Sequence, residues 1–165
     1  MSQVYLGLGS NVEPEKNICS CLKALADRFE VVATSKIYQT PAEGFEGADF
    51  LNAVVAIDTG YSVDSLRISL RSIEREHGRR RSQSEKFNSR TLDIDLLLYD
   101  ELVVEAANYR LPHRDVMKYA FVLYPLSEIA PELEHPVLKQ RFCELADASA
   151  LSHDNMTTVE LDCAS

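Results

Sequence analysis

The sequence predicts an α+β fold, a ferredoxin-like α/β sandwich with a mainly antiparallel sheet and helices on its faces. The residue patterns follow one another in the order strand, helix, strand, strand, helix, strand, which is the order of that fold. The chain has 165 residues, the length of one domain with a substantial hydrophobic core. Hydrophobic residues make up 45% of the chain and charged residues 26%, as in ordinary globular proteins.

The first half of the chain supplies three of these strands and one helix. A strand is expected over residues 4–8, and Pro14 then suits the first turn of a helix. The apolar residues with helical spacing that follow are Ile18, Leu22, Leu25 and Phe29. A β-branched run predicts the next strand over residues 31–38, and a third strand is expected over 50–59. The segment between these strands is rich in Gly, Pro and acids, and we interpret it as a loop.

The second half completes the pattern. A helix is predicted over residues 63–77, because Val63, Leu66, Leu70 and Ile73 fall on one stripe. A strand is expected over 92–99, and a short helix or a strand–helix junction, broken by Pro125, over 121–129. We expect residues 1–145 to form the catalytic domain and residues 146–165 a polar tail outside it.

Charge and composition exclude several classes of function. The net charge is −9, so a polynucleotide ligand is not expected, and no segment has the ~20 apolar residues of a membrane span. The N-terminus shows no basic segment ahead of an apolar one, which predicts a cytoplasmic protein. Residues 77–90 nevertheless contain five Arg and Lys residues. A basic segment within an acidic chain favours a small anionic ligand.

The four cysteines are Cys19, Cys21, Cys143 and Cys163. They form neither a CxxC pair nor a zinc-binding spacing. We therefore expect all four to be small, reduced residues.

An acidic pair carries the strongest chemical signal. Side chains alternate along a strand, so Asp93 and Asp95 share one face of the strand predicted at 92–99, about 7 Å apart. Hard carboxylate oxygens favour magnesium over zinc. The alternative is a half-buried strand with a polar outer face. The arginines and the lysine of 79–90 favour the first interpretation, because guanidinium groups bind phosphate oxygens beside metal-bound triphosphates.

Four blocks of sequence match a known family in order. They are YLGLGSN at 5–11, YQTPAEGFEGADFLNAVV at 38–55, RTLDIDLLLYD at 90–100, and LPHRDVMKYAFVLYPLSEIAPEL at 111–133. The chain thereby resembles the 6-hydroxymethyl-7,8-dihydropterin pyrophosphokinases. The resemblance implies transfer of pyrophosphate from ATP, the co-substrate, to the pterin alcohol in folate biosynthesis.

The resemblance also implies roles for individual residues. Asp93 and Asp95 match the aspartates that bind two Mg²⁺ ions, and together with Arg79, Arg81 and Arg90 they form the implied catalytic set. The implied ATP contacts are Glu74, Arg79, Arg81, Arg90, Leu96, His113 and Arg114. The implied pterin contacts are Thr40, Pro41, Phe50, Asn52, Phe87 and Phe121. A stacked ring and an amide suit a flat heterocycle with several donors and acceptors.

The chain departs from the family pattern at two positions. Phe87 stands where a tryptophan is common, and Tyr119 stands where many members have an arginine. Lys118 or Arg114 is the candidate replacement for that charge. Two other functions stay open: a diverged member that binds nucleotide or pterin with weak or no catalysis, and another magnesium-dependent phosphotransfer enzyme or nuclease. The expected partners are small molecules, with no nucleic acid and no membrane, for a monomer that can associate with other folate enzymes.

Overall fold

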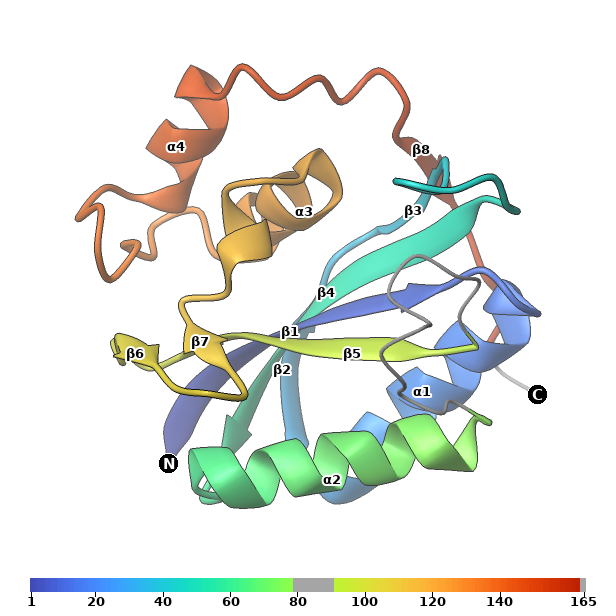
Figure 1. Cartoon of the computed structure of the whole chain (residues 1–165), viewed down its shortest axis with the longest axis horizontal. Coiled ribbons are helices and arrows are strands. Elements are labelled where there is room, and N and C mark those ends of the chain that lie inside the picture. The colour runs from blue at the N-terminus through green and yellow to red at the C-terminus, as the bar shows by residue number, and fades with distance from the viewer. Residues whose placement is uncertain (79–90, 164–165) are drawn as a thin grey trace.

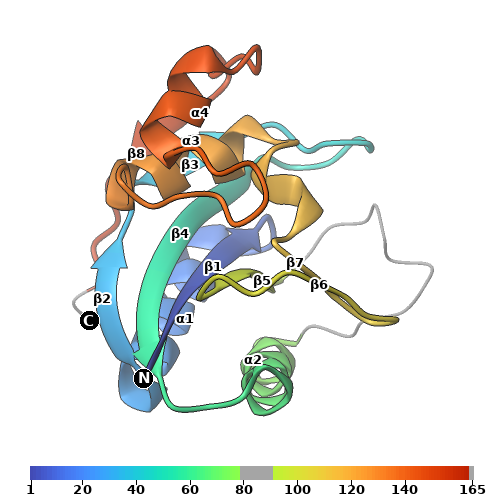
Figure 2. The same ribbon diagram turned by 90° about the vertical axis from the view of Figure 1, so that its left-hand side faces the viewer.

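The structure, a computed structural model, describes residues 1–78 and 91–163. Within these ranges a sheet of six strands lies between two layers of helices (Figures 1 and 2). Helices α1 (Pro14–Arg28) and α2 (Val63–Glu76) cover one face. Helix α3 (Ala120–Ile129) covers the other, with α4 (Phe142–Ala148) packed against it. The predicted α+β sandwich is confirmed.

The strand order confirms a mainly antiparallel sheet. The six strands are β1 (Ser2–Ser10), β2 (Glu30–Thr34), β3 (Ile37–Thr40), β4 (Phe50–Thr59), β5 (Asp93–Tyr99) and β8 (Thr157–Val159). They run in the order β5-β1-β4-β3-β8, with β2 also beside β4, and their pairings are antiparallel. Strands β6 (Val104–Glu105) and β7 (Arg110–Leu111) form a separate small ladder after β5.

The hydrophobic core lies on both faces of the central strands. Val4, Leu6 and Leu8 of β1 are buried against α1 and α2, whereas Tyr5 is buried on the side of α3. This is the alternation that a strand imposes when helices cover both of its faces. Strands β1, β4 and the start of β5 are therefore held on both sides, and they form a firm base for the side chains near their ends.

The single strand expected over residues 31–38 is two strands. Ser35, only 5% exposed, separates β2 from β3, and its backbone N–H donates to the carbonyl of Val54 at 2.9 Å. The hydroxyl of Ser35 in turn accepts from the N–H of Val54 at 2.9 Å. The side chain thus takes the place of a backbone partner, and the strand bends at this residue.

Helix α3 differs from the prediction at Pro125. We expected the proline to break the helix, but α3 continues through it to Ile129. Val122, Leu123 and Leu126 are buried on the same helix. Their burial supports the turn that lacks one backbone donor. None of the helices in the described ranges combines the length and the hydropathy of a membrane span.

The C-terminal segment is attached to the sheet. Helix α4 crosses the boundary that we expected at residue 145. Strand β8 then pairs with β3, with Val159 opposite Ile37. Val159 and Leu161 pack against the core on the side of α1 and α2. Residues 157–161 therefore extend the sheet and its core.

The expectation of four reduced cysteines is wrong for two of them. Cys19 of α1 and Cys163 form a disulfide, with their Cα atoms 5.2 Å apart. The pairing of β8 with β3 brings the C-terminal segment back to α1, a proximity that residue spacing does not reveal. Cys21 is free and buried, and burial raises the pKa of its thiol to about 12. Cys143 is also free.

Candidate active site

The acidic strand β5 faces two glycines of its neighbour. In the ladder between β1 and β5, Asp95 lies opposite Gly7 and Asp93 lies opposite Gly9. Opposite residues in an antiparallel pair project from the same face, so no side chain of β1 crowds the two carboxylates. A Cβ atom at Gly9 would lie 3.2 Å from the amide oxygen of Asn52. Glycine therefore permits the close approach of this amide to the acidic strand.

Glu74 of α2 is hydrogen-bonded to the backbone of the same strand. It lies on α2, is 2% exposed, and accepts a hydrogen bond from the backbone N–H of Ile94 at 2.8 Å. Its carboxylate fixes the backbone between Asp93 and Asp95, and so helps to set the positions of both. Glu74 is absent from the lining of the two cavities described below, and the ATP contact that the resemblance implies for it stays a prediction.

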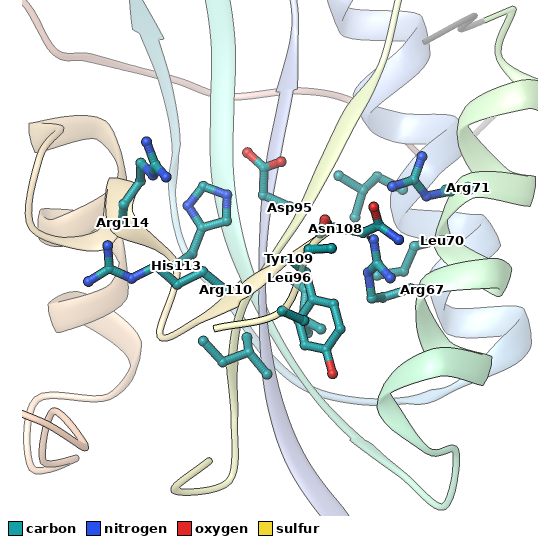
Figure 3. A pocket seen from close by; sticks show the side chains of 14 residues that line it. Arg67, Leu70, Arg71, Asp95, Leu96, Asn108, Tyr109, Arg110, His113 and Arg114 are labelled. Carbon is teal, nitrogen blue, oxygen red and sulfur yellow. Dashed lines mark hydrogen bonds between the residues drawn. The ribbon is translucent and has the colours of Figure 1, made fainter. Parts of the chain in front are cut away.

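The first cavity, which we call the arginine cavity, has a volume of about 360 Å³ and lies between α2 and the segment 94–114 (Figure 3). Its lining includes the guanidinium groups of Arg67, Arg71, Arg110 and Arg114. Arg67 donates to the carbonyl of Asn108 at 3.1 Å, and its guanidinium lies over the ring of Tyr109, 4.6 Å from the centroid. Such a cavity suits a polyanion that carries a planar group.

Three residues that the resemblance assigned to ATP, Leu96, His113 and Arg114, line the arginine cavity. Arg67 and Arg71 are additions that our sequence analysis missed. They lie four residues apart on α2, the spacing of one helix face, whereas the sequence analysis considered only the apolar stripe of this helix.

The second cavity, the aromatic cavity, has a volume of about 310 Å³ and lies over the ends of β1, β3 and β4. It contains Thr40, Pro41, Phe50, Asn52 and Phe121, which are the described members of the implied pterin set. The buried amide of Asn52 donates to the hydroxyl of Thr40 at 2.7 Å. This bond orients the amide toward one edge of any ligand.

Two ring pairs from the described residues line the aromatic cavity. Tyr119 and Phe121 are stacked, with centroids 5.0 Å apart and planes 14° apart. Phe45 and Phe50 form an edge-to-face pair with centroids 6.3 Å apart. Sequence analysis did not single out Phe45, because it lies in the loop before β4. Flat apolar surfaces next to an oriented amide suit a planar heterocycle with polar edges.

The two cavities meet at Asp95. Asp95 and Arg114 line both of them, and Asp93 lines the aromatic cavity. In Figure 3, His113 and Arg114 lie on one side of Asp95, and Arg67 and Arg71 lie on the other. One ligand atom each from Asp95, His113 and Asp115 lies within 4.8 Å of the others. Carboxylates at such a junction can hold divalent cations between two ligands.

His113 is held as a neutral hydrogen-bond donor. Its backbone N–H donates to the carbonyl of Leu97 at 2.9 Å, and its Nδ1 accepts from the backbone N–H of Asp115 at 3.1 Å. Burial lowers the pKa of this imidazole, an effect that Asp115 and Asp93 partly oppose. The neutral ring therefore carries its proton on Nε2.

Four residues of the implied site, Arg79, Arg81, Phe87 and Arg90, lie outside the described residues. The assignment of the three arginines to the catalytic set and to ATP, and of Phe87 to the pterin, stays a prediction from sequence.

Two cavities that meet at one carboxylate suit the transfer of a group from one bound ligand to the other. The site therefore suits an enzyme that moves a phosphate-containing group from an anionic donor to a planar acceptor. Comparison with known proteins gives the particular family. The family described as 7,8-dihydro-6-hydroxymethylpterin-pyrophosphokinase (HPPK) matches residues 5–131. The chain belongs to this family.

Curated relatives support the same assignment over most of the chain. A 2-amino-4-hydroxy-6-hydroxymethyldihydropteridine pyrophosphokinase of Aquifex aeolicus is 34% identical over 153 residues, covering 92% of this chain and 94% of that protein. The protein of the same name from Methylorubrum extorquens is 42% identical over 137 residues, covering 81% of this chain and 85% of its own length.

Solved structures share the fold. The chain of wild-type Plasmodium falciparum HPPK-DHPS with SDX-DHP superposes with a TM-score of 0.70 at 13% identity. The superposition covers 96% of this chain but only 47% of that one, so this chain spans about half the length of that protein.

Proposed function

We propose that this protein is a pyrophosphokinase that transfers the terminal pyrophosphate of ATP to 6-hydroxymethyl-7,8-dihydropterin. The products are the pterin pyrophosphate and AMP, in a step of folate biosynthesis. One observation carries the proposal beyond family membership: the arginine cavity and the aromatic cavity meet at Asp95. A reaction that joins two substrates needs a shared boundary of this kind.

The arginine cavity is the proposed ATP site. Arg67, Arg71 and Arg110 would bind the nucleotide, and the Nε2–H of neutral His113 would donate to a phosphate oxygen. The loop arginines Arg79, Arg81 and Arg90 are proposed as further contacts, on the resemblance alone.

The aromatic cavity is the proposed pterin site. Phe50 and Phe121 supply ring faces, and Asn52, oriented by Thr40, reads the polar edge of the heterocycle. Pro41 adds an apolar wall. A pterin bound by these residues would have its hydroxymethyl group toward Asp95.

Asp93 and Asp95 are the proposed ligands for two Mg²⁺ ions. The donor set fits this cation, because both groups are carboxylates on one face of a strand and glycines lie opposite them. Bound there, the cations would neutralise charge on the triphosphate. The contribution of the chain is to hold the two carboxylates, through Glu74, and to align the two substrates.

An assay of AMP release tests this function. The reaction mixture contains hydroxymethyl-dihydropterin, ATP and magnesium, and controls omit the pterin or the metal. We expect AMP in proportion to pterin pyrophosphate in the full mixture and none without the pterin. Binding of both ligands without AMP release would identify a binding protein that lacks catalysis.

We also propose that the enzyme acts in the cytoplasm, as a monomer that can associate with other folate enzymes. The chains named HPPK-DHPS motivate the association. Because disulfides are rare in the reducing cytosol, the state of Cys19 and Cys163 in cells tests the location. Alkylation of thiols in fresh lysate, followed by mass spectrometry, would show whether the pair is reduced there, and light scattering would give the oligomeric state.

A further inference from the structure

The junction between the two cavities has one described cation that faces both sides. Among the described residues, Arg67, Arg71 and Arg110 line only the arginine cavity, and Lys118 lines only the aromatic cavity. Arg114 lines both, together with the carboxylate of Asp95. As far as the described residues go, one guanidinium and one carboxylate are therefore shared by the two cavities.

The segment before and after Arg114 is anchored, while its side chain is exposed. Arg114 begins a short 3-10 helix, η2 (Arg114–Val116), which His113 caps. The hydrogen bond from His113 to Leu97 ties this turn to β5, and Val116 is fully buried. Within the described part of the chain, no hydrogen bond or ion pair engages the guanidinium of Arg114. The group is thus positioned by a fixed backbone and remains available to a ligand.

The side chains at positions 118 and 119 contact aromatic rings. Tyr119 carries no charge, and its ring is stacked on that of Phe121. The ammonium group of Lys118 lies over the ring of Tyr119, 5.1 Å from the centroid. Of the two candidate replacements for a cation at position 119, the geometry therefore favours Arg114.

We propose that Arg114 is a catalytic residue that binds the β-phosphate oxygens of the pyrophosphoryl group in transit between the two cavities. The role rests on the proposed function. In the transfer, the hydroxyl oxygen of the pterin forms a bond to the β-phosphorus, and the bond from that phosphorus to the bridging oxygen breaks. AMP leaves with the bridging oxygen, and the hydroxyl proton passes to water. The β-phosphorus must lie at the junction in this step, and the guanidinium stabilises the charge on its oxygens.

The test compares Arg114→Gln with two matched variants that each line one cavity, Arg110→Gln and Lys118→Gln. Single-turnover AMP release is measured with both substrates saturating, and the binding of a non-hydrolysable ATP analogue and of the pterin is measured separately by calorimetry. For Arg114→Gln we expect a loss of about 100- to 1000-fold in the rate at saturation, as for other groups that stabilise a transition state. For the other two variants we expect weaker binding of one ligand with a much smaller loss at saturation.

Two further variants test the shape and the position of the charged group. Arg114→Lys should keep part of the rate, because it retains the charge but loses the planar fork. The double variant Arg114→Gln/Tyr119→Arg should recover part of the loss, because it returns a guanidinium to the wall of the aromatic cavity. Circular dichroism and the melting temperature, which an exposed side chain should not change, control for folding.

The possible outcomes separate this inference from the proposed function. An active wild-type enzyme with Arg114→Gln within about threefold of its rate overturns the role of Arg114 alone. An equal loss of rate in Arg114→Gln and Arg110→Gln also overturns it, since the removal of one positive charge from the site would then explain both losses. A wild-type protein that releases no AMP overturns the proposed function, and the role of Arg114 with it.

Discussion

The two cavities differ in the kind of recognition that they support. The arginine cavity is lined by four described guanidinium groups and built from α2 and the segment 94–114, whereas the aromatic cavity is built on the ends of β1, β3 and β4. The first attracts a ligand through charge that salt can screen, and the second through ring faces and an oriented amide. Of the residues that the structure describes, only Asp95 and Arg114 belong to both, so changes at the other described residues should affect one ligand and spare the other.

The largest effect is expected at the shared carboxylate. Asp95→Ala should reduce AMP release by at least about 1000-fold, because it removes a proposed metal ligand at the point where both substrates meet. The melting temperature should change little, since Asp95 is only partly buried. Glu101→Ala, on the exposed turn after β5, is the matched control. Near-normal turnover of Asp95→Ala would refute the magnesium assignment.

A smaller and one-sided effect is expected in the aromatic cavity. Phe121→Ala should weaken pterin binding by about 1–3 kcal/mol, the usual contribution of stacking on a heterocyclic base. Binding of an ATP analogue should not change. Calorimetry with each ligand measures both, and Phe121→Tyr, which keeps a ring, should bind pterin almost normally. Equal losses for both ligands would show that the cavities are not independent.

In the wild-type protein, salt should weaken ligand binding in the arginine cavity but not in the aromatic cavity. Raising the ionic strength from about 0.05 to 0.5 M shortens the screening length severalfold. Binding of the ATP analogue should weaken, by roughly tenfold, while pterin binding stays constant. Arg67→Gln should show a shallower dependence of ATP binding on salt. A steep salt dependence of pterin binding would contradict the division between the two sites.

The smallest effect concerns stability against pH. The pKa of His113 is lowered in the folded protein. Below about pH 6.5 its imidazole therefore binds a proton more readily in the unfolded chain than in the folded protein. The free energy of unfolding should therefore fall as the pH drops below that value, and this contribution is absent above it. His135, whose pKa is also lowered by burial, acts in the same direction. Urea unfolding of His113→Gln and His135→Gln between pH 5 and 8 should each show a shallower fall than the wild type.

The sequence predicted those parts of the site that follow from local pattern. Alternation along one strand placed Asp93 and Asp95 on the same face, and the strand is observed at Asp93–Tyr99. The second helix was expected over 63–77 and is observed at Val63–Glu76, since its apolar stripe is regular. The aromatic cavity contains the five described residues that the resemblance implied.

Features that depend on distant partners could not be predicted. Ser35 divides a strand because it bonds to Val54, which lies on another strand. Arg67 and Arg71 line a cavity because the segment 94–114 folds against α2, which the pattern of the helix alone does not contain. The bond from the backbone N–H of Ile94 to Glu74 joins β5 to α2, and the pattern of neither element contains it. In each case the missing information was the tertiary contact.

The disulfide between Cys19 and Cys163 joins residues 144 positions apart, so most of the polypeptide forms a closed covalent loop. One cut by a protease anywhere inside this loop opens it without separating the two pieces. A molecule cut in the exposed stretch near residue 153 would therefore migrate as one band on a non-reducing gel and as two bands after reduction. The fragment that carries α4 and the central strands would stay linked to β8 even when the peptide bond between them is lost.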